Sequence, residues 1–286
     1  MADSRVYVVN NPLPKPISAW TEADLVAGGY SSLPVIYQDE LSFFGTTPTP
    51  SLALSSDFLA CLDAEDALDG DKEAYELLQY LDATTMRTPG EESPVNDFVV
   101  ALLRALNFAP KGAMIRTQKD LPFRTRHGVQ HVKADVCILE GTNPLLIIQE
   151  DKSHLDPFYN TFVRLIATAV ASFGVDASYR TQYDIEARRN DTIHGIIMNG
   201  SWPTFYKIPN SRTVVNQIEA WGSGSWTYQI QVYRPSVQRP LQREREGMKP
   251  LDNRKIILSS FLRFKYSMFE NAGKGMDYFS KLKKKT

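Results

Sequence analysis

The chain has 286 residues, of which 43% are hydrophobic, and a formal net charge of −1 at pH 7. This length suits one domain with additions or two small domains, and the near-neutral charge argues against indiscriminate binding of nucleic acid. No apolar run approaches the roughly twenty residues of a membrane-spanning helix. The N-terminus carries Asp3 and lacks a long apolar stretch, so we do not expect a secretory signal. Because Cys61 and Cys137 are too few for a disulfide framework, we expect a reducing intracellular compartment, nuclear or cytoplasmic.

We expect residues 1–85 to form an extension on the N-terminal side of the main domain. Val6 to Pro14 favours an edge strand or extended arm, and the TTPTP stretch at 46–50 favours a linker. Residues 57–82 hold nine acidic residues against Lys72 alone, and their apolar positions predict one or two short helices. We expect a solvated helical face, with an acidic plug or a protein-partner surface as alternatives.

A helix is predicted over 94–107, where the apolar residues follow helical spacing. These apolar residues are Val95, Phe98, Val99, Leu102, Leu103 and Leu106. Ser93 is the expected N-cap before Pro94. Two acids, Glu92 at the helix mouth and Asp97 inside it, are candidates for a functional carboxylate. The alternative is that either one only complements the helix dipole.

The segment 133–154, KADVCILEGTNPLLIIQEDKSH, predicts a β-hairpin. Apolar residues alternate through 132–139, a cluster of turn residues fills 140–144, and 145–149 is a short apolar run typical of a buried strand.

If this hairpin is centred near Thr142 and Asn143, Asp135 lies across from Glu150. The strand period of two places Lys152 on the face of Glu150. Two close carboxylates stay ionised at low cost only with a cation between them, and Mg²⁺ or Mn²⁺ suits such an oxygen-rich site. A lysine beside the ion could orient or deprotonate a water, which is the constellation of phosphodiester hydrolysis. The alternative is an ordinary salt-bridge cluster at the mouth of a sheet.

Basic residues crowd the approach to Asp135 in the chain. They are Arg116, Lys119, Arg124, Arg126 and Lys133. A basic lip beside a metal site is what a phosphate backbone requires, although a solvated loop and edge strand is an equal alternative. His127 and His131 have metal-ligand spacing, but the strand pattern around Gly128 argues against a zinc site.

The remaining segments predict a helix over 158–173, strands over 193–198 and 204–208 around a turn at 199–203, and another strand over 226–233. A last helix is expected to start at Asp252 or Asn253. The basic tail 281–285 could add affinity for nucleic acid or act as a nuclear address. Such tails are usually only disordered.

Asp135 fifteen residues before the Glu150-Asp151-Lys152 run, between strands and with a helix on either side, resembles the core of the PD-(D/E)xK nuclease superfamily, with Ala134 in place of the nominal proline. The resemblance covers roughly residues 86–270. It implies a restriction-endonuclease-like α/β fold, a mixed central sheet flanked by helices, with residues 271–286 as a basic tail.

The resemblance also implies roles for individual residues. Asp135, Glu150 and the backbone carbonyl of Asp151 would bind Mg²⁺, and Lys152 would place the attacking water. Glu92 or Asp97 would act as an outer acid, with Gln149 as a supporting group. The implied function is hydrolysis of nucleic acid, DNA being favoured. A core that acts within a larger assembly or as a homodimer is a further alternative. The second hypothesis is a catalytically silent nuclease fold that serves as a binding module, with a protein partner on the acidic helices.

Two longer stretches also resemble uncharacterised proteins of mushroom-forming fungi that carry the same QEDK element. These stretches are GIIMNGSWPTFYKIP, at 195–209, and GMKPLDNRKIILSSF, at 247–261.

Overall fold

The computed structural model describes residues 35–46, 54–67, 70–84, 94–109, 111–125, 128–141, 143–151, 160–182, 191–210, 229–236 and 246–272. The predicted N-terminal arm, the basic tail and all but the first residue of the TTPTP stretch lie outside these ranges. Among the described helices, none is long and apolar enough to cross a membrane.

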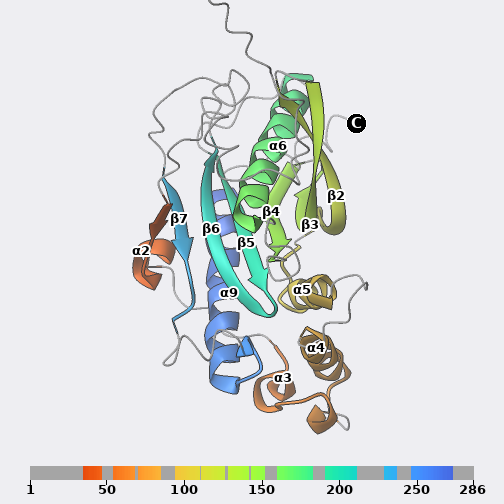
Figure 1. Ribbon diagram of the computed structural model, residues 1–286. Helices are drawn as coiled ribbons and strands as arrows, with labels where there is room; N and C mark the ends of the chain where they lie inside the picture. The colour runs from red at the N-terminus through yellow and green to blue at the C-terminus, as the bar shows by residue number, and fades with distance from the viewer. Residues whose placement is uncertain are drawn as a thin grey trace, which may run out of the picture.

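A mixed sheet of seven strands forms the centre of the protein (Figure 1), and its spatial order is β1-β7-β6-β5-β4-β3-β2. The β1/β7 and β4/β5 pairs are parallel, and the other pairs are antiparallel. The strands are β1 (Val35–Tyr37), β2 (Ala113–Thr125), β3 (Gly128–Glu140), β4 (Asn143–Glu150), β5 (Asp191–Asn199), β6 (Trp202–Asn210) and β7 (Ile230–Tyr233). The prediction of an α/β fold with a mixed sheet flanked by helices is therefore confirmed.

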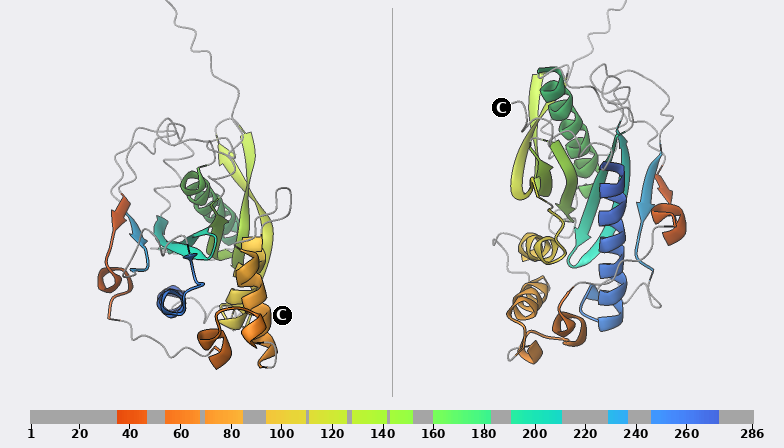
Figure 2. Two further views of the ribbon diagram at one scale, coloured as in Figure 1. Left: turned by 60° about the horizontal axis from the view of Figure 1, so that its bottom comes forward. Right: turned by 180° about the vertical axis from the view of Figure 1, so that it is seen from behind.

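Helices cover both faces of this sheet. They are α2 (Glu40–Phe44), α3 (Ser56–Ala60), the 3₁₀ turn η3 (Glu65–Ala67), α4 (Lys72–Ala83), α5 (Pro94–Ala105), α6 (Thr161–Gln182) and α9 (Leu251–Ala272). The left view of Figure 2 shows α6 and α9 on opposite sides of the strands. One apolar cluster joins the sheet to α6, and a second joins the opposite face to α4, α5 and α9. We call these the α6 face and the α9 face.

The segments predicted with strong apolar periodicity appear as expected, while several boundaries differ. The helix expected over 94–107 ends at Ala105, and the one expected over 158–173 continues to Gln182. The turn before β6 comprises only Gly200 and Ser201, because the left-handed φ of 58° at Gly200 permits a tight hairpin. Of the strand expected over 226–233 the structure gives β7, and 226–228 lie outside the described residues. The last helix begins at Leu251, and the side-chain amide of Asn253 donates to the Gly247 carbonyl.

The N-terminal segment shares the core of the α9 face. Phe43, Phe58 and Leu77 are buried in the same cluster as Phe261 and Val99. The acidic stretch therefore forms short helices, as predicted, whose apolar sides pack in the core of the α9 face. Its strongest polar connection is made by one buried arginine.

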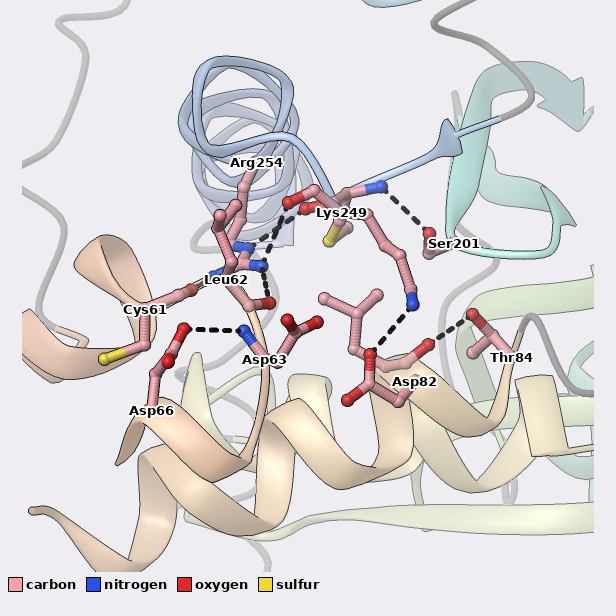
Figure 3. Close-up of polar contacts among 11 residues, drawn as sticks. Cys61, Leu62, Asp63, Asp66, Asp82, Thr84, Ser201, Lys249 and Arg254 are labelled. Carbon is pink, nitrogen blue, oxygen red and sulfur yellow. Dashed lines mark hydrogen bonds and ion pairs between the residues drawn. The ribbon is translucent and has the colours of Figure 1, made fainter. Parts of the chain in front are cut away.

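Arg254, in the first turns of α9, is fully buried and donates all five of its N–H groups to backbone carbonyls. Figure 3 shows several of these contacts between the α3 segment and the turn before α9. The bonds run from Nε to Met248 (3.0 Å), from Nη1 to Phe58 (2.7 Å) and Cys61 (2.6 Å), and from Nη2 to Leu62 and Lys249 (3.2 Å each). Burial lowers the pKa of Arg254, while nearby Asp82 and Asp63 oppose that shift. Arg254 therefore ties two segments distant in the chain.

Candidate active site at the end of strand β4

The structure brings Asp135 and Glu150 together. Asp135 lies on β3 and is 2% exposed, and Glu150 ends β4 and is 5% exposed. The backbone N–H of Glu150 donates to Oδ2 of Asp135 over 2.9 Å. Two acidic residues that lie fifteen positions apart in the chain are thus adjacent in a buried part of the sheet.

The route to this contact differs from the predicted hairpin. Glu140 pairs with Asn143, so the hairpin turns one position earlier in the chain than predicted. A register shift follows between Ile138 and Leu139, and the pairing ends at Val136 with Ile148. Extended by one residue, this register sets Asp135 opposite Gln149. The Asp135 side chain reaches the Glu150 amide diagonally, because the real pairing is offset by one position from the predicted one.

Gln149 and Asp151 connect the end of β4 to β3 and to α6 by hydrogen bonds. The fully buried Gln149 donates from Nε2 to the Lys133 carbonyl and to Oγ1 of Thr168, each over 3.1 Å. Its Oε1 is buried and has no hydrogen-bond partner among the described residues. Asp151 accepts a hydrogen bond from Thr161, the first residue of α6, at 3.0 Å. The end of β4 is therefore held by both β3 and α6.

Asp97, the other predicted acid that the structure describes, does not join Asp135 and Glu150. Asp97 lies on the exposed side of α5. Within the part of the chain that the structure describes, no three acidic, histidine or cysteine side chains are grouped so that they could hold a metal ion. Glu92 and Lys152 lie outside the described residues, as do Arg126, His127 and the side chain of Arg124.

The two acidic residues that do meet carry oxygen ligands of the kind that a hard divalent cation prefers. Proteins commonly bind Mg²⁺ through one or two carboxylates while it keeps several waters. Asp135 and Glu150 supply that number of carboxylates, and the carbonyl of Asp151 directly follows Glu150 in the chain. The residue types present therefore match the preference of Mg²⁺ or Mn²⁺.

Three of the predicted phosphate-binding residues are described near this site. Arg116 and Lys133 are exposed, and Lys119 is half-buried. Sequence reasoning missed two residues of α6. The Nη2 of Arg164 lies 3.5 Å from the Lys133 carbonyl, and Oγ1 of Thr168 accepts the hydrogen bond from Gln149. Their spacing of four on a helix, inside an otherwise apolar stripe, is the signal that could have revealed them.

Cys137 on β3 is expected to be unreactive. Burial raises the pKa of its thiol to about 11, against weaker opposite effects of Lys119 and Arg116. At about pH 8 roughly one thiol in a thousand would be ionised. Mass spectrometry after iodoacetamide treatment should therefore find Cys61, which is half-buried, labelled long before Cys137. Equal labelling rates in the folded protein would contradict this, and the Cys61→Ser variant isolates the slower site.

No model of a known protein family matches the chain, and no protein with a curated description matches it.

Proposed function

We propose that this protein is a metal-dependent nuclease of the PD-(D/E)xK type that hydrolyses phosphodiester bonds, with DNA as the favoured substrate. The observation that carries the proposal is the contact between buried Asp135 and Glu150 at neighbouring positions of β3 and β4. The order α5-β2-β3-β4-α6-β5, with the two middle strands supplying the acids, supports it.

In this proposal Asp135, Glu150 and the Asp151 carbonyl hold Mg²⁺ or Mn²⁺. The bound ion would supply positive charge to the scissile phosphate and lower the pKa of a water. Lys152, two residues beyond Glu150, orients the attacking water, and Gln149 keeps β4 in place through Lys133 and Thr168. The exposed Lys133, two residues before Asp135, contacts a phosphate of the substrate.

A second candidate is the silent binding module. It is favoured by the exposed position of Asp97 and by the lack of a three-ligand group among the described residues. In that case Asp135 and Glu150 stabilise the sheet, and partners bind elsewhere, including the exposed side of the acidic helices.

The test is cleavage of labelled DNA and RNA, single- and double-stranded, with Mg²⁺ or Mn²⁺. Wild type should cut, whereas Asp135→Asn, Glu150→Gln and Lys152→Ala should lose at least about 100-fold in rate, because each removes a group that acts on the metal or the water. Asp66→Asn, a change at an exposed acid of η3, is the control and should cut as wild type does. If wild type neither cuts nor binds Mg²⁺ by calorimetry, the binding module replaces the nuclease.

A further inference from the structure

A local irregularity crosses β2 and β3 at the level of Asp135. Gln118 on β2 has a φ of 50°, in the left-handed region that residues other than glycine uncommonly adopt. Thr117 pairs with Val136 and Lys119 pairs with Ala134, but the intervening pair, Gln118 with Asp135, is missing from the ladder. The pairing register is the same before and after this position. The irregularity therefore rotates the side chains of both strands without shifting the pairing.

At this point the side chains of alternate residues pass from one face of the sheet to the other, on both strands. On β3, Val132 and Ala134 pack in the cluster of the α6 face, whereas Val136 and Ile138 pack in the cluster of the α9 face. In a regular strand these residues would share one face, because side chains alternate with a period of two. On β2, Ile115 packs against the α9 cluster, while Leu121 lies in the α6 cluster.

The exchange bears directly on the two acids. Glu150 pairs with Met198, which lies in the cluster of the α9 face, and paired residues share a face. Asp135 lies at the reversal itself, between Ala134 of the α6 cluster and Val136 of the α9 cluster. Its Oδ2 accepts the backbone N–H of Glu150 at this point. The reversal and the contact between the two acidic residues therefore coincide.

The same reversal brings two basic residues onto one face. Arg116 and Lys119 are three positions apart, which in a regular strand would put them on opposite faces. Arg116 pairs with Cys137 and Lys119 pairs with Ala134, and both partners belong to the cluster of the α6 face. Both cations also lower the pKa of the Cys137 thiol, in keeping with their position on its side of the sheet.

We propose that Gln118 is a positioning residue: its left-handed backbone reverses β2 and β3, which sets the Asp135 carboxylate against the backbone amide of Glu150. The catalytic use of this geometry rests on the proposed nuclease function, whereas the geometry itself does not. The Gln118 side chain is exposed, so the backbone conformation is what matters. Glycine can adopt this φ freely, and a β-branched residue strongly resists it.

The first readout needs neither metal nor substrate. In the ¹⁵N-labelled full chain, the Glu150 amide resonance reports the hydrogen bond to Asp135, and Asp135→Ala shows its position without that bond. Gln118→Gly should leave the resonance at the wild-type position, and Gln118→Val should move it toward the Asp135→Ala position. Thr117→Val, at an exposed and regularly paired neighbour, should leave it unchanged. If Gln118→Val does not fold, Gln118→Ala should show a smaller shift in the same direction.

The second readout is kinetic. Gln118→Gly should retain the cleavage rate, and Gln118→Val should lower kcat at least tenfold. An unmoved Glu150 resonance in both Gln118→Val and Gln118→Ala, or an equal shift in Gln118→Gly, would overturn the positioning role. If the resonances behave as expected and wild type does not cut, the positioning role stands and the nuclease function fails.

Discussion

Replacement of Arg254 by methionine is expected to lower the free energy of unfolding by about 3–5 kcal/mol. The guanidinium is fully buried and is the donor to five backbone carbonyls, from the α3 segment and from the turn before α9. Methionine fills a similar volume but donates no hydrogen bond, so these carbonyls lose a partner that water cannot easily replace. Lysine keeps the charge but has three donors and lacks the planar guanidinium group. The free energy of unfolding of Arg254→Lys should therefore lie between those of wild type and Arg254→Met.

Urea unfolding followed by circular dichroism measures this loss. Lys255→Met, the same change at the next and exposed position of α9, is the control and should alter stability by less than about 0.5 kcal/mol. A loss of similar size in both variants would mean that the hydrogen bonds of Arg254 are not what stabilises this junction.

Acidification is expected to destabilise the protein through His194. The residue lies on β5, is 2% exposed, and packs edge-on against Phe264 with ring centroids 5.1 Å apart. Its Nε2 has no hydrogen-bond partner among the described residues. Burial, and next the positive charge of Lys207 on β6, lower the pKa of His194 from 6.5 to about 3. The folded protein therefore keeps this imidazole neutral at pH values where the unfolded chain protonates it.

Proton linkage gives the direction in which the lowered pKa of His194 changes the stability with pH. The stability that the neutral His194 contributes is complete above about pH 6.5 and is lost progressively as the pH falls toward about 3, because only the unfolded state gains the proton. At about 1.4 kcal/mol per pH unit, the loss from this group between about pH 6.5 and about pH 5 is roughly 2 kcal/mol.

Chemical unfolding at a series of pH values should therefore show a steeper loss in wild type than in His194→Met, which cannot be protonated. His131→Gln removes an exposed histidine paired with Asp120, and it should retain the wild-type slope. Identical slopes in wild type and His194→Met would show that the imidazole finds a way to carry its charge in the folded state.

Sequence periodicity predicted the helix α5 and the strands β3 and β4 because each has a strong local pattern of apolar residues. Asp135 and Glu150 were identified as acidic residues within the first strand and at the end of the second, which is again local information. Their mutual approach was inferred from a regular hairpin, and here the reason was wrong although the two residues do meet. The real turn comes earlier in the chain than predicted, and the Asp135 side chain bridges the offset.

The sequence by itself determined the main helices and strands and the identity of the two acids, since these depend on apolar periodicity and on residue type. The mixed sheet flanked by helices was expected from the resemblance to a known family and not from periodicity. Only the tertiary structure decided that Gln118 reverses two strands, that Asp97 faces outward and that Arg254 joins α3 to α9. A backbone dihedral at one exposed glutamine and hydrogen bonds to distant carbonyls leave no trace in local composition. They arise when segments far apart in the chain pack together and the polar groups between them must be satisfied.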